Sequence, residues 1–232
     1  MTIASNIERI KKRVKAACKR ANRSPDEVKI VAVSKLHPVE KIIEAYSNGL
    51  RIFGENRVQE AKEKFEILKD YQIEWHLIGH LQKNKVKYAV NIFDFIHSID
   101  SIELAEKVEK RLEKIGKTIK GFIQVKLSEE ETKHGVLIEE LDNLARFCRN
   151  LNYVKIIGLM TVPPYFDDVE KVRPYFVKLR ELRDKLNKEV FENSLTELSM
   201  GMTHDFEVAI EEGATYVRIG TGIFGERNYD GN

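Results

Sequence analysis

The chain has 232 residues, of which 42% are hydrophobic and 33% are charged, a balance that supplies a full core and excludes an intrinsically disordered protein. No segment approaches the roughly 20 consecutive apolar residues of a membrane span, and Met1–Lys12 lacks the apolar core of a secretory signal, so we expect a cytoplasmic protein with no membrane partner. The 39 Lys and Arg residues nearly balance the 37 Asp and Glu residues, and this net charge of +2 gives no support for a nucleic-acid partner.

Eight short runs rich in β-branched and apolar residues recur along the chain. They lie at Val28–Ser34, Arg51–Phe53, Ile73–Ile78, Phe93–His97, Gly121–Val125, Val154–Met160, Leu195–Ser199 and Thr215–Ile219. Several runs are almost continuously apolar instead of alternating. This pattern is typical of parallel strands that are covered on both faces of the sheet.

Amphipathic segments with helical spacing separate these runs. They lie at Ile3–Cys18, Val39–Ser47, Arg57–Leu68, Gln82–Val90, Ile102–Ile115, Ile138–Cys148, Val169–Leu186 and Thr203–Glu211. Two pairs, Ser24 with Glu27 and Asp100 with Glu103, have the spacing of helix N-terminal capping boxes. Both cysteines, Cys18 and Cys148, fall on apolar stripes of these segments, so we expect buried, inert thiols and no disulfide framework.

The alternation predicts an α/β protein in which residues 1–232 form one (β/α)8 TIM barrel domain, because no linker or repeat divides the series. An open doubly wound sheet is the alternative, although such sheets more often have fewer strands. The residues after the last strand, Gly220–Asn232, are too few for a full closing helix. The opening helix is therefore expected to fill that gap in the outer ring.

In a barrel, the chemistry belongs to residues at the carboxyl ends of the strands. Lys35 follows the first strand, so its amine is expected to reach into the barrel mouth. Partial desolvation there favours the neutral amine, the form that attacks an aldehyde to make a Schiff base. The competing interpretation is a surface lysine before the turn at His37-Pro38.

The last two strands lead into loops that favour an anion. Gly220–Gly225 matches the GxGxxG pattern, but only seven residues follow it, so the helix and acidic residue of a dinucleotide fold cannot follow. Glycines still permit close backbone approach, and Ser199–Thr203 precedes a helix on the neighbouring strand. These loops predict a phosphate site, because barrels often hold phosphate after strands seven and eight.

His76 and His80 have the i,i+4 spacing of a zinc-binding helix. Gly79 lies between them, the intervening catalytic Glu of that motif is absent, and the preceding residues predict a strand. We therefore predict packing or hydrogen-bonding roles for both histidines and no metal site.

Seven sequence blocks in order, from Val31 to Arg227, carry a resemblance to a known family. They read VAVSK, FGENRVQE, EWHLIGHLQKNK, HSID, GLMTV, LSMGMTHDFEVAI and VRIGTGIFGER. Together they resemble the pyridoxal phosphate homeostasis protein family, whose fold is the N-terminal barrel of the alanine racemase type. Thr203 stands where many members carry Ser, which keeps the hydroxyl.

The resemblance implies that the cofactor is pyridoxal 5'-phosphate (PLP). Lys35 would hold PLP as a Schiff base, and Ser199, Gly220 and Thr221 match positions that contact the phosphate. Arg218 matches the residue that faces the pyridine nitrogen, and Asn56 and Met160 match positions near the ring. Family members act in PLP supply and in amino-acid and keto-acid balance, so we expect a carrier or regulator that is not an enzyme.

Weak catalysis is also expected on chemical grounds. Arg218 only donates hydrogen bonds, so a ring nitrogen that faces it stays unprotonated and PLP becomes a poorer electron sink. A racemase barrel also uses a tyrosine base from a second domain, which this chain is not long enough to supply. Two alternatives remain, a PLP-dependent amino-acid racemase and a PLP-free barrel aldolase that uses Lys35.

The expected partners are small molecules and other PLP proteins. Besides PLP itself, amino acids are expected to enter as external aldimines, because an open barrel mouth does not prevent exchange of amines. Transient contact with apo-enzymes that need PLP is expected as well, and the chain is expected to be a monomer.

Overall fold

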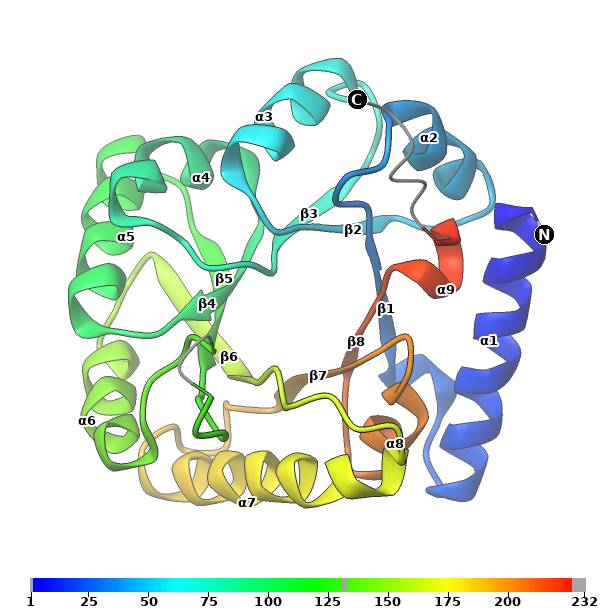
Figure 1. Cartoon of the computed structure of the whole chain (residues 1–232). Coiled ribbons are helices and arrows are strands. Elements are labelled where there is room, and N and C mark those ends of the chain that lie inside the picture. The colour runs from blue at the N-terminus through cyan, green and yellow to red at the C-terminus, as the bar shows by residue number, and fades with distance from the viewer. Residues whose placement is uncertain (1, 131–132, 227–232) are drawn as a thin grey trace.

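Eight parallel strands form a closed barrel in the computed structural model, which describes residues 2–130 and 133–226 (Figure 1). The strands are β1 (Lys29–Val33), β2 (Ile52–Glu55), β3 (Glu74–Leu77), β4 (Phe95–Ile99), β5 (Ile119–Gln124), β6 (Val154–Met160), β7 (Glu197–Met202) and β8 (Tyr216–Ile219). Each strand pairs with the next in sequence, and β8 pairs with β1 through registers such as Val31 with Arg218. The predicted (β/α)8 barrel is therefore confirmed, and the open sheet is excluded.

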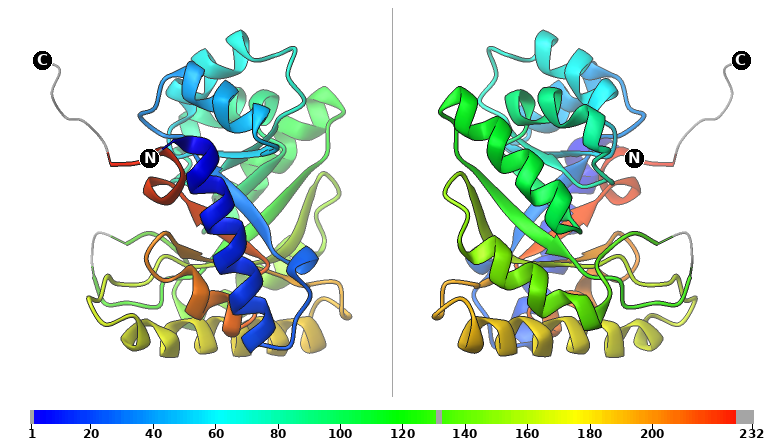
Figure 2. Two further views of the ribbon diagram at one scale, coloured as in Figure 1. Left: turned by 90° about the vertical axis from the view of Figure 1, so that its right-hand side faces the viewer. Right: turned by 90° about the vertical axis from the view of Figure 1, so that its left-hand side faces the viewer.

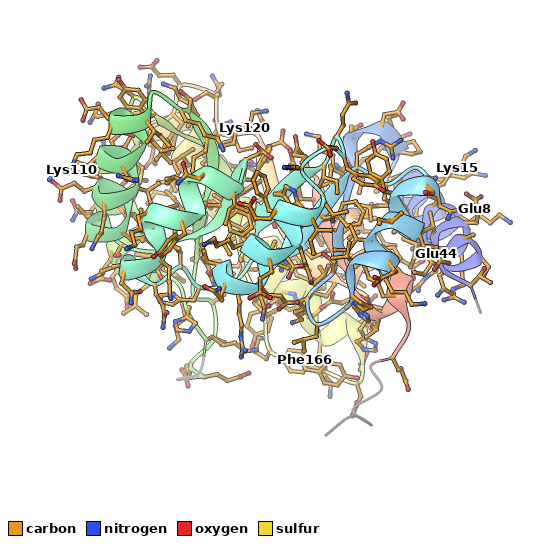
Figure 3. The ribbon with its side chains drawn as sticks, turned by 90° about the horizontal axis from the view of Figure 1, so that it is seen from above. Glu8, Lys15, Glu44, Lys110, Lys120 and Phe166 are labelled. Atoms are coloured by element: carbon orange, nitrogen blue, oxygen red, sulfur yellow. The ribbon has the colours of Figure 1, made fainter. Side chains whose placement is uncertain are left out.

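Helices surround the barrel as an outer ring (Figure 1). They are α1 (Ile3–Arg20), α2 (Val39–Ser47), α3 (Val58–Ile67), α4 (Val86–Ile92), α5 (Ile102–Ile115), α6 (Ile138–Arg149), α7 (Arg173–Glu189), α8 (Phe206–Glu211) and α9 (Thr221–Phe224). Charged side chains such as Lys15 of α1 and Lys110 of α5 point outward from this ring (Figure 3). No helix of the described residues combines the length and the apolar character needed to cross a bilayer.

The opening helix α1 completes the ring between α8 and α2, as the sequence predicted. It packs against α2, α8 and the short α9, and it runs along the outside of the barrel (Figure 2). Its apolar face, which includes Ile7, Ile10 and Cys18, is buried. The side-chain amide of Asn6 also donates a hydrogen bond of 2.9 Å to the carbonyl oxygen of Ile223, which ties α1 to α9.

The core has two layers, one inside the barrel and one between the barrel and the helices. The inner layer consists of Val31, Phe95, Phe122, Met160 and Tyr216, one from each of five strands. Both cysteines lie in the outer layer, as expected, and burial raises the pKa of the Cys148 thiol to about 12. These thiols therefore stay protonated at neutral pH.

Several element boundaries differ from the predictions. The capping box of Ser24 and Glu27 is confirmed, but Asp100 does not cap α5. Ser101 is the N-cap and accepts from the Leu104 amide at 3.3 Å, because Asp100 turns instead toward His80. The seventh strand continues to Met202, three residues beyond its predicted end. Arg227, the end of the last sequence block, lies outside the described residues.

Candidate functional site

A cavity of about 440 Å³ opens at the carboxyl ends of the strands. Five of the predicted site residues lie on its wall, namely Lys35, Asn56, Arg218, Gly220 and Thr221. The remaining wall residues are Val33, Ile78, Gly79, Val162, Met202, Thr203 and His204. The structure does not bring Met160 or Ser199 to this wall, because both side chains are fully buried in the barrel.

The backbone before Lys35 is held by a buried ion pair. Ser34 Oγ donates to Glu55 Oε1 at 2.6 Å, and Lys64 Nζ donates to the same oxygen at 2.8 Å. Lys64 Nζ also donates to the carbonyl oxygen of Ser34 at 2.8 Å. Burial raises the pKa of Glu55, and the charge of Lys64 opposes that rise. The strand end that carries Lys35 is thus fixed by charged groups from β2 and α3.

The residue after Lys35 adopts a left-handed conformation that glycine prefers. Leu36 has φ of 62°, which costs a non-glycine residue roughly 1 kcal/mol. Its amide donates to Glu60 Oε1 at 2.5 Å, and Lys64 Nζ donates to that oxygen at 2.6 Å. The network therefore holds a strained turn directly beside the reactive amine. Sequence reasoning missed Glu60 and Lys64, because their i,i+4 spacing indicates only an ordinary helix pair.

Arg218 brings a positive charge to the inner wall of the cavity. It is buried, its Nη1 donates to Ser199 Oγ at 2.7 Å, and its Nη2 donates to the carbonyl oxygen of Thr161 at 2.8 Å. Burial lowers the pKa of this guanidinium to about 10, and the nearby Asp205 carboxylate opposes that change. Arg218 is therefore still a cation at neutral pH.

A chain of hydrogen bonds runs from Arg218 through the barrel interior. Ser199 Oγ contacts His97 Nδ1 at 2.8 Å, and His97 Nε2 contacts His76 Nδ1 at 2.8 Å. His76 Nε2 then contacts Glu74 Oε1 at 2.9 Å. The expected hydrogen-bonding role of His76 is confirmed.

The two ends of this chain determine where its protons lie. A guanidinium only donates, so the Ser199 hydroxyl accepts from Arg218 and has its own proton to give to His97 Nδ1. A carboxylate only accepts, so His76 Nε2 donates to Glu74 and its Nδ1 accepts from His97 Nε2. Both ends therefore predict the same donor-to-acceptor direction along the chain, from Arg218 to Glu74, provided that both imidazoles are neutral.

The histidine pKa values agree with this requirement. Burial lowers the pKa of His97 well below its ordinary value; protonation of the neighbouring His76 would lower it further, as the Arg218 cation does. Burial also lowers the pKa of His76, although the Glu74 carboxylate opposes this. With both imidazoles neutral, one continuous chain of hydrogen bonds connects the cavity wall to Glu74.

The loops after β7 and β8 meet at a threonine. Thr203 Oγ1 accepts from the amide of Gly222 at 3.2 Å and joins the two loops. A Cβ on Gly222 would lie 2.9 Å from a methyl carbon of Ile219 and 3.0 Å from one of Thr203, so a side chain would push the loops apart. Thr203, Gly220 and Thr221 therefore form one side of the cavity. Thr203 belongs to the loop that the sequence predicted for phosphate, although Ser199 was the residue expected to make the contact.

The wall has a matching group for each functional part of PLP. Lys35 offers an amine for the aldehyde, Arg218 a donor for the ring nitrogen, and the Thr203–Gly220–Thr221 side hydroxyls and backbone for the phosphate. Asn56 Oδ1 is buried with no hydrogen-bond partner among the described residues, so this acceptor on the cavity wall can take a hydrogen bond from a ligand. The residues present therefore fit this cofactor.

Comparisons with known proteins agree on one family. Residues 5–228 match the family model for the alanine racemase N-terminal domain. The "Pyridoxal phosphate homeostasis protein" of Aquifex aeolicus is 50% identical over 229 residues, which cover 99% of this chain and 100% of that protein. The protein of the same name from Escherichia coli K12 is 37% identical, with 98% of this chain and 97% of that protein covered.

Solved structures support the same relationship. PipY of Synechococcus elongatus with PLP bound has a TM-score of 0.86 and 38% identity, and the match covers 97% of this chain and 100% of that chain. An alanine racemase of Clostridium difficile has a TM-score of 0.71 but only 16% identity, with 99% of this chain and 58% of that chain covered. The second likeness concerns the fold alone.

We predict that the buried His97 makes the protein less stable in mild acid. Its folded-state pKa lies below the ordinary value of 6.5, so the unfolded chain binds more protons as the pH falls below 6.5. The stability that neutral His97 contributes is present above that pH and is lost on acidification, with a slope of at most about 1.4 kcal/mol per pH unit.

Urea unfolding of His97→Gln between pH 7 and pH 5 checks this prediction. The variant should lose less stability over this interval than the unsubstituted chain, although it should be less stable at pH 7. His204→Gln is the matched control, because that histidine is exposed. Equal losses in the unsubstituted chain and His97→Gln would contradict the prediction.

Proposed function

Because the chain belongs to the pyridoxal phosphate homeostasis protein family, we propose that it holds PLP in the rim cavity as a carrier or regulator and not as an enzyme. The observation that carries the proposal is the meeting of an amine, a fixed cation and a glycine-threonine loop on one cavity wall. Each of these three groups complements a different part of PLP. The named relatives, and PipY with PLP bound, support the same ligand.

Lys35 is the proposed attachment point. PLP supplies an aldehyde that condenses with a primary amine, with loss of water, and a ring that withdraws electrons. Lys35 starts from the end of β1, where Ser34, Glu55 and Lys64 hold the backbone. This network fixes the backbone from which the Lys35 side chain starts, so little backbone entropy is lost when the bond forms.

Thr203, Gly220 and Thr221 are the proposed phosphate contacts. Two hydroxyls and a glycine backbone can converge there on one dianion, and charge-assisted hydrogen bonds of this kind are among the strongest. Ser199 has a different role in this proposal. Its hydroxyl already bonds to Arg218 and His97, so it positions the cation instead of the phosphate.

Arg218 favours binding over catalysis. As a permanent donor it leaves the ring nitrogen unprotonated, and an unprotonated ring stabilises a carbanion poorly. The bonds to Ser199 and Thr161 keep the guanidinium in this place. The proposed protein therefore binds PLP, exchanges it with amino acids through the open mouth of the barrel, and passes it to apo-enzymes with little turnover of its own.

The closed barrel offers no free strand edge in its described part, and we propose that the chain acts as a monomer.

Replacing Lys35 by alanine should abolish covalent attachment without unfolding the protein, because the lysine is a rim residue and not part of the core. Absorption spectra should lose the Schiff-base band. Borohydride reduction followed by peptide mapping should label Lys35 in the unsubstituted chain only. Lys15→Ala, an exposed lysine on α1, is the matched control and should keep both signals. A band that persists in Lys35→Ala would assign the bond to another lysine.

Pyridoxal, which lacks the phosphate, should bind at least on the order of 100-fold more weakly than PLP, because it forgoes two or more charge-assisted hydrogen bonds. Thr203→Ala and Thr221→Ala should lower the ratio of the pyridoxal Kd to the PLP Kd, as measured by equilibrium titration of both ligands. Ser199→Ala should weaken both ligands to a similar extent and leave the ratio unchanged. If Ser199→Ala narrows the ratio as much as the threonine variants do, Ser199 contacts the phosphate directly.

Turnover of L-alanine to D-alanine should lie orders of magnitude below the usual enzyme range of ~1–1000 per second. Racemisation needs a strong electron sink and a base on each face of the substrate, and Arg218 weakens the sink. Saturating L- and D-alanine should nevertheless change the absorption spectrum, because amino acids can exchange with Lys35. Turnover equal to that of a racemase assayed alongside would favour the racemase alternative.

A further inference from the structure

Three potential metal ligands gather on the rim beside the cavity. His80 follows β3, Asp100 follows β4 and His134 lies in the segment after β5. One ligand atom from each side chain lies within 4.8 Å of the other two. The i,i+4 partner of His80 in the sequence, His76, takes no part, because it points into the barrel and bonds to His97 and Glu74. The fold thus brings together a set that no sequence spacing indicates.

The backbone beside each histidine is fixed by close contacts. A Cβ on Gly79, the residue before His80, would lie 2.3 Å from the carbonyl oxygen of Asn56, so the two loops are in tight contact there. The carbonyl oxygen of His134 accepts from Gln124 Nε2 at 3.0 Å, and the next residues form a bridge between Val136 and Val125. The backbone that carries the two imidazoles is therefore held by the barrel rim.

The distances suit a shared ion better than a hydrogen bond. His80 Nδ1 lies 3.4 Å from Asp100 Oδ2, longer than the roughly 2.8 Å of a charge-assisted hydrogen bond. Two ligands on one tetrahedral zinc ion at about 2.0–2.1 Å are roughly 3.4 Å apart. The ring of His134 stacks on that of His80 with centroids 4.2 Å apart and planes 14° apart. Both histidines are exposed, so rotation of the rings can turn their nitrogens toward a common point.

We propose that His80, Asp100 and His134 bind a divalent transition-metal ion such as Zn²⁺. Two imidazole nitrogens and one carboxylate oxygen suit zinc and its neighbours in the first transition series, whereas Ca²⁺ and Mg²⁺ prefer oxygen ligands throughout. Three protein ligands leave one position for water or another small ligand. Because Gly79 lies on the cavity wall, the ion would join the loops after β3, β4 and β5 next to the cofactor cavity.

Calorimetric titration with Zn²⁺ tests the proposal, on a tag-free chain stripped of metal with EDTA. We expect one saturable ion per chain and a rise in the thermal unfolding temperature, because an ion that binds only the folded state stabilises it. Co²⁺ titrated into the same protein should give the visible bands of a four-coordinate site, and Zn²⁺ should remove them. The absence of saturable Zn²⁺ binding would overturn the proposal.

Variants distinguish this site from other surface histidines. His80→Ala and His134→Ala should each weaken Zn²⁺ binding by at least about tenfold, and Asp100→Asn should weaken it with little change in side-chain size. His204→Ala removes an exposed histidine on the same rim and should bind Zn²⁺ like the unsubstituted chain. Circular dichroism confirms that each variant is folded. Unchanged affinity in both His80→Ala and His134→Ala, or a loss in His204→Ala, would place the ion elsewhere.

Discussion

The buried positive charge of Arg218 is the interaction on which the interior of this barrel depends. An arginine cannot escape burial by losing its proton at neutral pH, so the surrounding groups must accept its hydrogen bonds. Ser199 and Thr161 do so directly. The Glu74 carboxylate only accepts hydrogen bonds, so His76, His97 and Ser199 in turn each donate toward it, and the Ser199 oxygen is left to accept from Arg218. The cation and the carboxylate thus form the two ends of one hydrogen-bond chain that connects the cavity wall to the far end of β3.

A second charged network controls the other side of the cavity. Glu55 and Lys64 are buried together, and this pair holds Ser34 and, through Glu60, the strained backbone of Leu36. Removing Lys64 would leave Glu55 buried without its cationic partner, which is strongly destabilising, whereas Lys64 without Glu55 would still contact Glu60. Lys35 thus extends from a backbone that charged groups hold in place, and it lines the cavity. In the proposed function, this fixed backbone positions the lysine that binds the aldehyde of PLP.

The loops at the rim supply many of the side chains that line the cavity. In the proposed function, Arg218 faces the ring nitrogen and the loops after β7 and β8 hold the phosphate, an arrangement that favours holding PLP over activating it. The cluster of His80, Asp100 and His134 adds a second set of ligands next to the first. Both sets come from loops that follow the strands, where a barrel can change its chemistry without disturbing its core.

Sequence patterns alone predicted the barrel, the placement of α1 and five residues of the cavity wall. These features follow from local patterns: apolar runs of strand length, helical stripes, a lysine directly after a strand and glycines directly after another. Lys35, Gly220 and Thr221 could be located because a residue that follows a parallel strand must lie at the carboxyl rim, whereas Asn56 and Arg218 were predicted from the family resemblance.

The remaining roles depend on strand register or on contacts between distant segments, which arise only when the chain folds. The seventh strand has an irregular register between Ser199 and Met202 and extends to Met202, so Ser199 lies buried within the strand instead of at its end, and Thr203 lines the cavity. A small change in strand end alters which side chains face inward, and no local pattern reveals it. Lys64 contacts Ser34 across 30 residues and His80 contacts His134 across 54, because closure of the barrel sets these distances and the amino-acid order alone does not.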